Sequence, residues 1–241
     1  MIYQRYRKDY TGEFLIYNVS LENGEYAEER EWVPNTIENN DHYGTAVVIG
    51  NGESRKPFNL IRIAKHRTGI GGVNRIQSYG CNALYRDFEP DFLVATNPEM
   101  VDEIIEKSTS EKTTILSNGV NLLTHPGKVH LIPYNVSFNA GAIAAYMACF
   151  DGHKRVYLMG FDNQPKESVN NNLYAGTECY GPADIKVSSD KWENAMWQVF
   201  RAFPDVTFSR IEPRYDTPKT WKSCLNYRQI TFREFALEVD L

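Results

Sequence analysis

From residue 45 onward, short apolar runs and longer polar or amphipathic stretches follow one another along the chain. Short runs rich in aliphatic, β-branched and aromatic residues recur along this part of the chain, at 45–49, 92–95, 113–116, 129–132, 155–159 and 207–211, and a further strand is expected near 74–79, before Gly80-Cys81-Asn82. Runs of this kind are typical of strands buried on both faces of a parallel sheet. Because helical stretches separate several of them, the pattern predicts an α/β fold, with a Rossmann-like, mostly parallel sheet and helices on both faces.

Local signals predict the helices between these runs. Pro98 is suited to the first turn of a helix, and residues 140–150 are small and apolar enough to pack close against a sheet. Ser189 or Asp190 can cap an amphipathic helix, and Ser54 can cap a helix after the first strand. The predicted helices cover about 54–65, 98–107, 140–150 and 190–203.

Two segments lie outside the strand–helix alternation. Residues 1–44 are polar, tyrosine-rich and acidic, and the turn signal Glu22-Asn23-Gly24-Glu25 predicts a small hairpin. Residues 163–187 contain Pro, Gly, Asn and Tyr without periodicity, which is typical of a lid or a binding wall. We therefore predict an N-terminal extension at 1–44 and a single Rossmann-like nucleotide-sugar-binding domain at 45–241, with a lid at 163–187.

The first predicted strand, Thr45–Ile49, runs into Gly50-Asn51-Gly52. The two glycines permit a tight turn and a close approach of a ligand to the backbone. A strand, a glycine turn and a helix start leave N–H groups facing one spot, which suits an anion such as phosphate. The spacing matches neither the dinucleotide fingerprint nor the Walker loop, so a plain tight turn between strand and helix is equally consistent.

Polar residues follow several of the predicted strands directly. In open α/β sheets, ligands bind outside the carboxyl ends of the strands. An amide side chain offers a donor and an acceptor without charge, which suits sugar hydroxyls, nucleobase edges and phosphate oxygens. Asn and Asp also favour turns for their own sake. Their number on one rim favours a binding site made from Asn51, Asn82, Asn97, Asn118 and Asp162.

Composition narrows the function classes further. The net charge of −5 argues against a general nucleic-acid binder. No apolar run reaches the length of a membrane span and no signal peptide opens the sequence, so we expect a cytoplasmic protein. The four cysteines and five histidines lack metal-ligand spacing, so no metal site is expected. The sequence leaves the oligomeric state open, a homo-oligomer included.

Four segments follow an order known from one enzyme family. They are G-N-G-E-S-R-K at 50–56, C-N-A-L-Y at 81–85, T-N-P-E-M at 96–100, and F-N-A-G through G-H-K-R-V-Y-L-M-G-F-D within 138–162. From Val47 to Asp162 the chain resembles the bacterial sialyltransferases of the Campylobacter type, glycosyltransferase family 42. The first and last segments are also similar to the broader group that contains the archaeal-type pterin diphosphokinases, whereas C-N-x-x-Y and T-N-P favour the sialyltransferases.

The resemblance implies a metal-independent, inverting transfer from CMP-sialic acid, or a related CMP-activated sugar, to a glycan acceptor, with no cofactor besides the donor. Such a transfer needs a base for the acceptor hydroxyl and donors that stabilise the departing phosphate. The resemblance implies that the CMP part is bound by Asn51 with its neighbour Gly52 and by Asn82. It also implies that the donor sugar is bordered by Asn97, Asn139 and Gly141.

The chain departs from the family at the base. The family's catalytic histidine lies in the lid, but this sequence has no histidine after His153. Asp184 is the nearest replacement in sequence, and Asp162 is the second choice. Asp162 can equally be a residue that defines the fold by accepting hydrogen bonds from backbone N–H groups.

Two further departures concern recognition of the donor. An arginine and a serine of the family are replaced by Ser137 and Ala140, so these positions no longer support recognition of the sialate carboxylate. Gln164 stands where the family has a phosphate-binding tyrosine. Tyr174 and Tyr180, both in the lid, could take over that role.

Two other function classes stay open. A diphosphokinase-like transferase acting on a pterin or another small alcohol would depend on ATP and Mg²⁺, and would need more rim carboxylates than Asp162. A catalytically inactive nucleotide-binding module would keep the fold and the pocket without the histidine.

Overall fold

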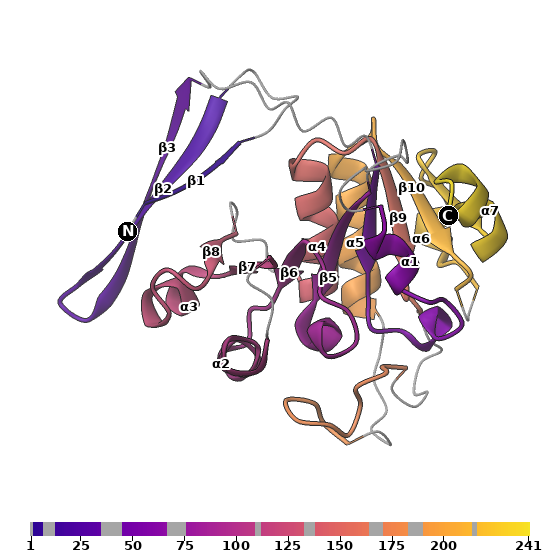
Figure 1. Ribbon diagram of the computed structural model, residues 1–241. Helices are drawn as coiled ribbons and strands as arrows, with labels where there is room; N and C mark the ends of the chain where they lie inside the picture. The colour runs from indigo at the N-terminus through magenta and orange to yellow at the C-terminus, as the bar shows by residue number, and fades with distance from the viewer. Residues whose placement is uncertain are drawn as a thin grey trace.

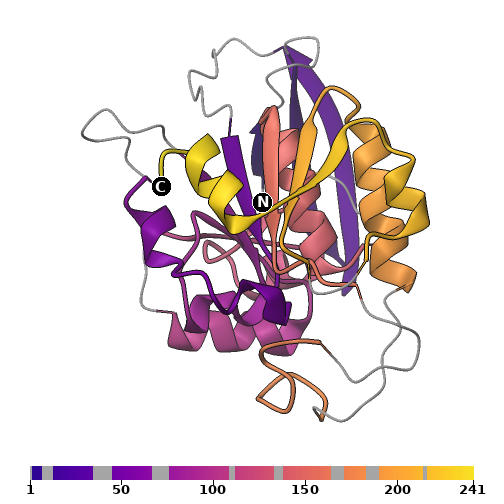
Figure 2. The same ribbon diagram turned by 90° about the vertical axis from the view of Figure 1, so that its right-hand side faces the viewer.

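An eight-stranded, all-parallel sheet forms the centre of the computed structural model (Figure 1). The structure describes residues 2–6, 13–34, 45–66, 76–108, 112–132, 138–163, 171–182, 190–213 and 216–241. Helices cover both faces of the sheet, as Figures 1 and 2 show from two sides. This arrangement confirms the predicted α/β, Rossmann-like class.

The sheet has the strand order β11-β10-β9-β4-β5-β6-β7-β8. Its strands are β4 (Thr45–Ile49), β5 (Gln77–Cys81), β6 (Phe92–Val94), β7 (Thr114–Ser117), β8 (His130–Leu131), β9 (Arg155–Met159), β10 (Thr207–Ile211) and β11 (Tyr227–Ile230). The helices longer than one turn are α2 (Pro98–Lys107), α3 (Gly119–Thr124), α4 (Ala140–Phe150), α5 (Asp190–Ala202) and α7 (Phe232–Glu238). Shorter helices are the 3₁₀ turns η1 (Glu53–Arg55) and η3 (Asn82–Arg86), and α1 (Ile61–Ala64) and α6 (Lys219–Lys222).

The order of the strands reverses between β4 and β9. From β4 the chain builds outward through β5, β6, β7 and β8, and α4 then returns it to β9 on the other side of β4. The two strands pair in register, with Ile49 opposite Met159. Ligands of open α/β sheets bind in the crevice outside the carboxyl ends of the strands at such a reversal. The turns after β4 and β9 are therefore where a site is expected.

Alternation along β4 divides the core into two. Val47 and Ile49 belong to the core on the face of α2 and α7, whereas Ala46 and Val48 belong to the core under α4 and α5. Successive side chains of a strand point to opposite faces, so a strand buried on both sides reads as one apolar run. The small residues of α4 let this helix pack against β4, β5, β6 and β9, as its sequence predicts.

The expected helix from Ser54 to Lys65 is wrong. Residues 53–55 form a 3₁₀ turn, and only the single turn of α1 follows. Ser54 does not act as the cap, because the N-cap position is Gly52 and no side chain of that residue can serve. Instead, a carboxylate from the turn after β9 accepts the Ser54 N–H, as described below.

The sheet also extends beyond Thr207–Ile211, the last strand that the sequence pattern predicts. β11 adds a further parallel strand on β10, and α7 packs behind it. The start of α7 carries a capping box, in which Thr231 accepts from the Glu234 N–H and the Glu234 carboxylate accepts from the Thr231 N–H. This signal, Thr-x-x-Glu, is readable in the sequence.

A separate antiparallel sheet occupies the N-terminal segment. It consists of β1 (Ile2–Tyr6), β2 (Glu13–Glu22) and β3 (Glu25–Pro34) in that order. The β2–β3 hairpin turns at Asn23 and Gly24, whose φ angles of 53° and 82° suit a two-residue hairpin turn. Figure 1 shows this sheet beside α3, with which β2 and β3 are in contact. Among the helices of the described ranges, none has the length and apolarity to cross a membrane.

Candidate functional site

The turns after β4 and β9 are fastened to each other through their backbones. Gly50 N–H donates to the Met159 carbonyl at 2.8 Å, and Gly52 N–H donates to the Gly160 carbonyl at 2.9 Å. A Cβ at Gly52 would lie 2.6 Å from both Gly160 O and an Asp162 carboxylate oxygen. The glycines thus serve contact between the two turns. The N–H of Gly52 faces Gly160 and is not open to a ligand.

Asp162 continues this fastening. Its carboxylate accepts the Ser54 N–H at 2.8 Å, and the residue is only 7% exposed. Arg210 on β10 holds the same turn. Its Nε donates to the Phe161 carbonyl at 2.7 Å, and its Nη2 donates to Asn163 Oδ1 at 2.6 Å. Asp162 therefore has a structural role, because it joins the turn after β9 to the turn after β4.

Asn51 and Asn82 lie on neighbouring strand ends, after β4 and β5, and Asn51 reaches the hydroxyl of Tyr180. Asn51 Nδ2 donates to this hydroxyl at 3.0 Å. Burial raises the pKa of Tyr180, so its hydroxyl stays neutral. Asn51 therefore links the turn after β4 to the lid.

The backbone fixes both asparagines. The carbonyl of Asn51 accepts the Leu173 N–H at 2.8 Å, and the Asn51 side-chain oxygen lies 3.9 Å from the Cys81 thiol. Asn82 has a φ of 50°, in the left-handed region that Asn tolerates better than most residues. In the sequence, the signal for both residues is an asparagine close after a predicted strand.

The segment 171–182, the described part of the predicted lid, lies beyond the carboxyl edge of the sheet, drawn in orange in Figures 1 and 2. Tyr174 anchors it. The Tyr174 hydroxyl accepts from Arg55 Nη2 at 2.6 Å and donates to Asp87 Oδ2 at 2.7 Å, and Arg55 pairs with Asp87 at 2.9 Å. Burial raises the pKa of Tyr174, so its hydroxyl stays a neutral donor in this anchor.

A second anchor of the lid is built around the buried carboxylate of Glu103 on α2. Arg86 pairs with it at 2.5 Å, and the Tyr85 hydroxyl also donates to it. The Cys179 thiol of the lid lies 3.3 Å from the other carboxylate oxygen, and Arg86 also donates to the Glu178 carbonyl at 3.0 Å. The lid is thus tied to the sheet side by hydrogen bonds at both ends of its described part.

The remaining rim asparagines act as helix caps. The side-chain oxygens of Asn97, Asn118 and Asn139 accept from the backbone N–H of residues 99, 121 and 142, at 2.9, 3.0 and 2.9 Å. Capping is sufficient to explain an asparagine at these positions. A Cβ built on Gly141 would lie 3.8 Å from the Phe161 ring, so the start of α4 lies next to the turn after β9.

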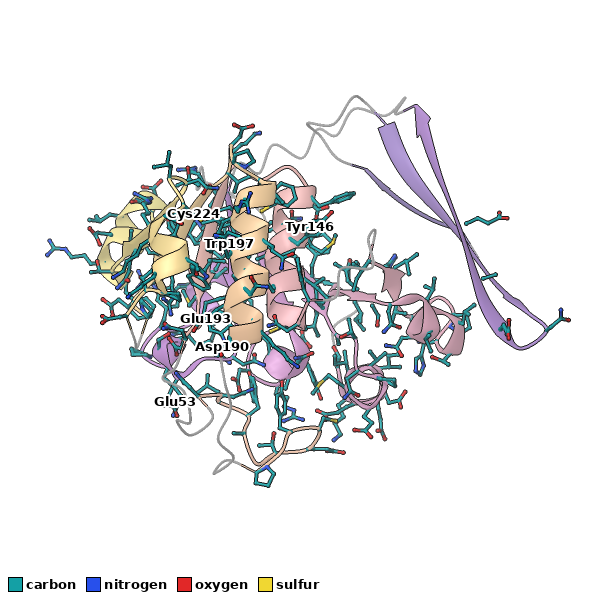
Figure 3. The ribbon with its side chains drawn as sticks, turned by 180° about the vertical axis from the view of Figure 1, so that it is seen from behind. Glu53, Tyr146, Asp190, Glu193, Trp197 and Cys224 are labelled. Atoms are coloured by element: carbon teal, nitrogen blue, oxygen red, sulfur yellow. The ribbon has the colours of Figure 1, made fainter. Side chains whose placement is uncertain are left out.

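The start of α5 faces the same edge. Figure 3 shows Asp190 and Glu193 at the end of α5 nearest Glu53, which follows β4, while Tyr146 on α4 and Trp197 on α5 lie further up the two neighbouring helices. Within the described ranges, no group of three or more His, Cys, Asp or Glu side chains is placed to hold a metal ion. Asp184, Gln164 and Ser137 lie outside the described residues.

No protein-family model matches the chain, and no curated protein shows significant similarity to it.

Proposed function

We propose that this chain is a glycosyltransferase that uses CMP-sialic acid or a related CMP-activated sugar and binds the donor phosphate at Asn51 and Asn82. The observation that supports this most is the position of the two asparagines, which follow the neighbouring parallel strands β4 and β5 beside the reversal of strand order between β4 and β9. Uncharged donors held by turns suit a phosphate oxygen whose charge grows as the leaving group departs.

The reaction would be a direct displacement at the anomeric carbon. The acceptor hydroxyl forms the new glycosidic bond while the bond to the phosphate of CMP breaks, and CMP leaves with the electron pair. A carboxylate base takes the proton of the acceptor hydroxyl. Donors around the phosphate lower the barrier because they bind the leaving group more strongly as its charge increases.

For the base we propose Asp184, because Asp162 is engaged by the Ser54 N–H. Asp184→Asn is expected to lower kcat by about a hundredfold or more without changing the unfolding temperature. Asp162→Ala is expected to cost about 1–3 kcal/mol of stability, because it leaves the partly buried Ser54 N–H without its acceptor. Kinetics and thermal unfolding of the two variants separate these roles. Full activity of Asp184→Asn would exclude Asp184 as the base.

The first experiment is a thermal-shift screen with CMP, CDP, UDP, GDP and ATP, each with and without Mg²⁺, followed by an assay of donor cleavage. We expect stabilisation by CMP without a requirement for Mg²⁺, and release of CMP from the donor. A shift with ATP and Mg²⁺ alone would contradict the proposal and favour the diphosphokinase-like class. A CMP shift without cleavage of any CMP-sugar would favour the inactive binding module.

Asn82→Gly tests the phosphate contact itself. Glycine accepts the left-handed backbone at this position, so the variant removes the amide without straining the turn. If the amide meets a charged phosphate, the affinity for CMP falls by about ten- to a hundredfold. Titration calorimetry measures the change.

Asn23→Gly is the matched control. Asn23 also has a positive φ, of 53°, but it lies in the turn of the β2–β3 hairpin. The affinity of Asn23→Gly for CMP is expected to equal that of the wild type. Equal CMP affinity in Asn82→Gly and in this control would count against Asn82 as a phosphate ligand.

A further inference from the structure

A cavity of about 470 Å³ lies beside the Tyr174 anchor of the lid. Its walls come from η1 and α1, from the residue that follows η3, and from the start of segment 171–182. A volume of this size is typical of sites for small molecules. We infer that this cavity binds a neutral saccharide, the acceptor of the transfer. The inference rests on the proposed function and names the acceptor site that this function requires.

The position of the cavity is the first argument. The segments η1 and η3 follow the neighbouring strands β4 and β5, so the cavity lies on the carboxyl side of the sheet, where ligands of parallel sheets bind. Leu173 forms part of its wall and donates its N–H to the Asn51 carbonyl at 2.8 Å. Leu173 therefore contacts both Asn51 and the cavity, so a molecule in the cavity lies close to the proposed donor phosphate.

The second argument is a pair of hydrogen-bonding groups in the lining. Asp87 uses one carboxylate oxygen, Oδ2, for both Arg55 and Tyr174, and its side chain is 48% exposed. Its Oδ1 makes no hydrogen bond to the residues that the structure describes. Asn59 Oδ1 accepts the Ile61 N–H at 3.1 Å, which leaves the Asn59 amide nitrogen as a donor. A sugar hydroxyl donates and accepts, so neighbouring hydroxyls can use both groups.

The charges around the cavity favour a neutral ligand. Arg55 pairs with Asp87 at 2.9 Å, and Lys56 pairs with Glu53 at 3.3 Å. Both cations of the lining therefore already have a carboxylate partner. A phosphate in this cavity would lie beside the Asp87 carboxylate, which repels it. The nucleotide is thus better placed at Asn51 and Asn82, outside the cavity.

The rest of the lining suits the C–H surface of a sugar ring. Leu60, Ile61 and Leu173 contribute aliphatic surface, and the Ile61 side chain is 66% exposed. Phe58 is only 9% exposed and stacks on Phe232 at 5.4 Å between ring centroids, so it supports this wall from the core side. Covering exposed aliphatic surface adds affinity that the two polar groups alone do not supply.

Two variants of exposed residues test the cavity. Ile61→Arg puts a long, charged side chain at its rim, and Asn59→Asp keeps the oxygen that accepts the Ile61 N–H while it removes the donor. Saturation-transfer NMR with lactose, maltose and N-acetyllactosamine is expected to show binding of at least one of them to the wild type, with or without saturating CMP. Affinity for that saccharide is expected to fall about tenfold or more in Ile61→Arg and about three- to tenfold in Asn59→Asp.

Leu225→Arg is the matched control, because Leu225 is a fully exposed leucine in the loop between α6 and β11. Its saccharide affinity is expected to equal that of the wild type, and thermal unfolding checks that all three variants are folded. Absence of saccharide binding to the wild type, equal binding by Ile61→Arg, or displacement of the saccharide by CMP would each overturn the inference.

An assay of the CMP-sugar separates this inference from the proposed function. Cleavage of the donor by water is expected to be equal in the wild type and Ile61→Arg, whereas transfer to the saccharide is expected to fall about tenfold at low saccharide concentration. Equal transfer by both proteins would leave the glycosyltransferase function standing and overturn the acceptor site. Saccharide binding that Ile61→Arg weakens, without cleavage of any CMP-sugar, would keep the cavity as a saccharide site and refute the glycosyltransferase function.

Discussion

Gly160→Ala is expected to lower the free energy of unfolding by about 3 kcal/mol or more, the largest single effect among the variants of the crevice. Gly160 has a φ of 70°, in which an alanine is strained by about 1–2 kcal/mol. A Cβ there would lie 2.8 Å from the Gly50 carbonyl oxygen and 3.2 Å from the Arg55 side chain. Both neighbours are fixed, because Arg55 Nε donates to that same carbonyl at 3.0 Å.

Thermal and denaturant unfolding measure the effect, which corresponds to a decrease of about 6–12 °C for a domain of this size. Gly127→Ala is the control, because Gly127 has a φ of 78° but open space around the position of a Cβ. The control is expected to show only the backbone strain, about 1 kcal/mol. Equal losses of stability in both variants would mean that the contact between the two turns makes no measurable contribution to the free energy of unfolding. A destabilised Gly160→Ala is also expected to bind CMP weakly, since the crevice is formed by these turns.

Arg86→Ala is expected to cost about 3 kcal/mol of stability, because it removes the cation from a buried carboxylate. The Glu103 side chain is 3% exposed and the Arg86 side chain 22%, and their closest atoms are 2.5 Å apart. Tyr85 and Cys179 continue to donate to Glu103, but neither carries a compensating charge. Arg86 also holds the Glu178 carbonyl, so amide exchange in the lid is expected to rise in the same variant.

The same carboxylate makes stability depend on pH. Burial raises the pKa of Glu103, but hydrogen bonds from Tyr85 and Arg86 outweigh it and hold the pKa below its ordinary value. The unfolded chain therefore binds a proton at a higher pH than the folded chain does. This contribution is complete above the ordinary glutamate pKa of about 4.3 and is lost as the pH falls through the folded value.

Denaturant unfolding of the wild type and of Glu103→Gln at a series of pH values between about 7 and 3 checks this expectation. At neutral pH the variant is expected to be the less stable protein, because its neutral amide pairs poorly with Arg86. The difference is expected to shrink as the pH falls from about 5 to 3, since Glu103 becomes protonated in the wild type. If the difference in stability between the two proteins stayed constant over this pH range, Glu103 would not be the cause of the loss of stability in acid.

The crevice illustrates how far local signals in a sequence reach. The rule that ligands bind at strand ends led to five polar residues, and two of them, Asn97 and Asn118, are helix caps. Asn51 differs from those caps because its side chain meets Tyr180 of the lid instead of a backbone N–H a few residues ahead. A cap and a ligand-binding asparagine follow the same kind of strand, so their sequence patterns do not distinguish them.

Features that depend on neighbours within one element can be predicted from the residues alone. The apolar run Thr45–Ile49, the small-residue helix Ala140–Phe150 and the Asn23-Gly24 turn are set by side-chain alternation and backbone preference, and the structure has each of them at its predicted position. These preferences act over a few residues, so a short stretch of sequence is enough to predict them.

Contacts between segments far apart in the chain depend instead on the folded arrangement of the sheet. The expected helix after β4 became a 3₁₀ turn whose Ser54 N–H is accepted by Asp162, 108 residues away. The amide of Asn51 found its partner in Tyr180, 129 residues along the chain. Such contacts depend on which strand ends the sheet order brings together, and that order follows from packing the whole core, which no short stretch of sequence encodes.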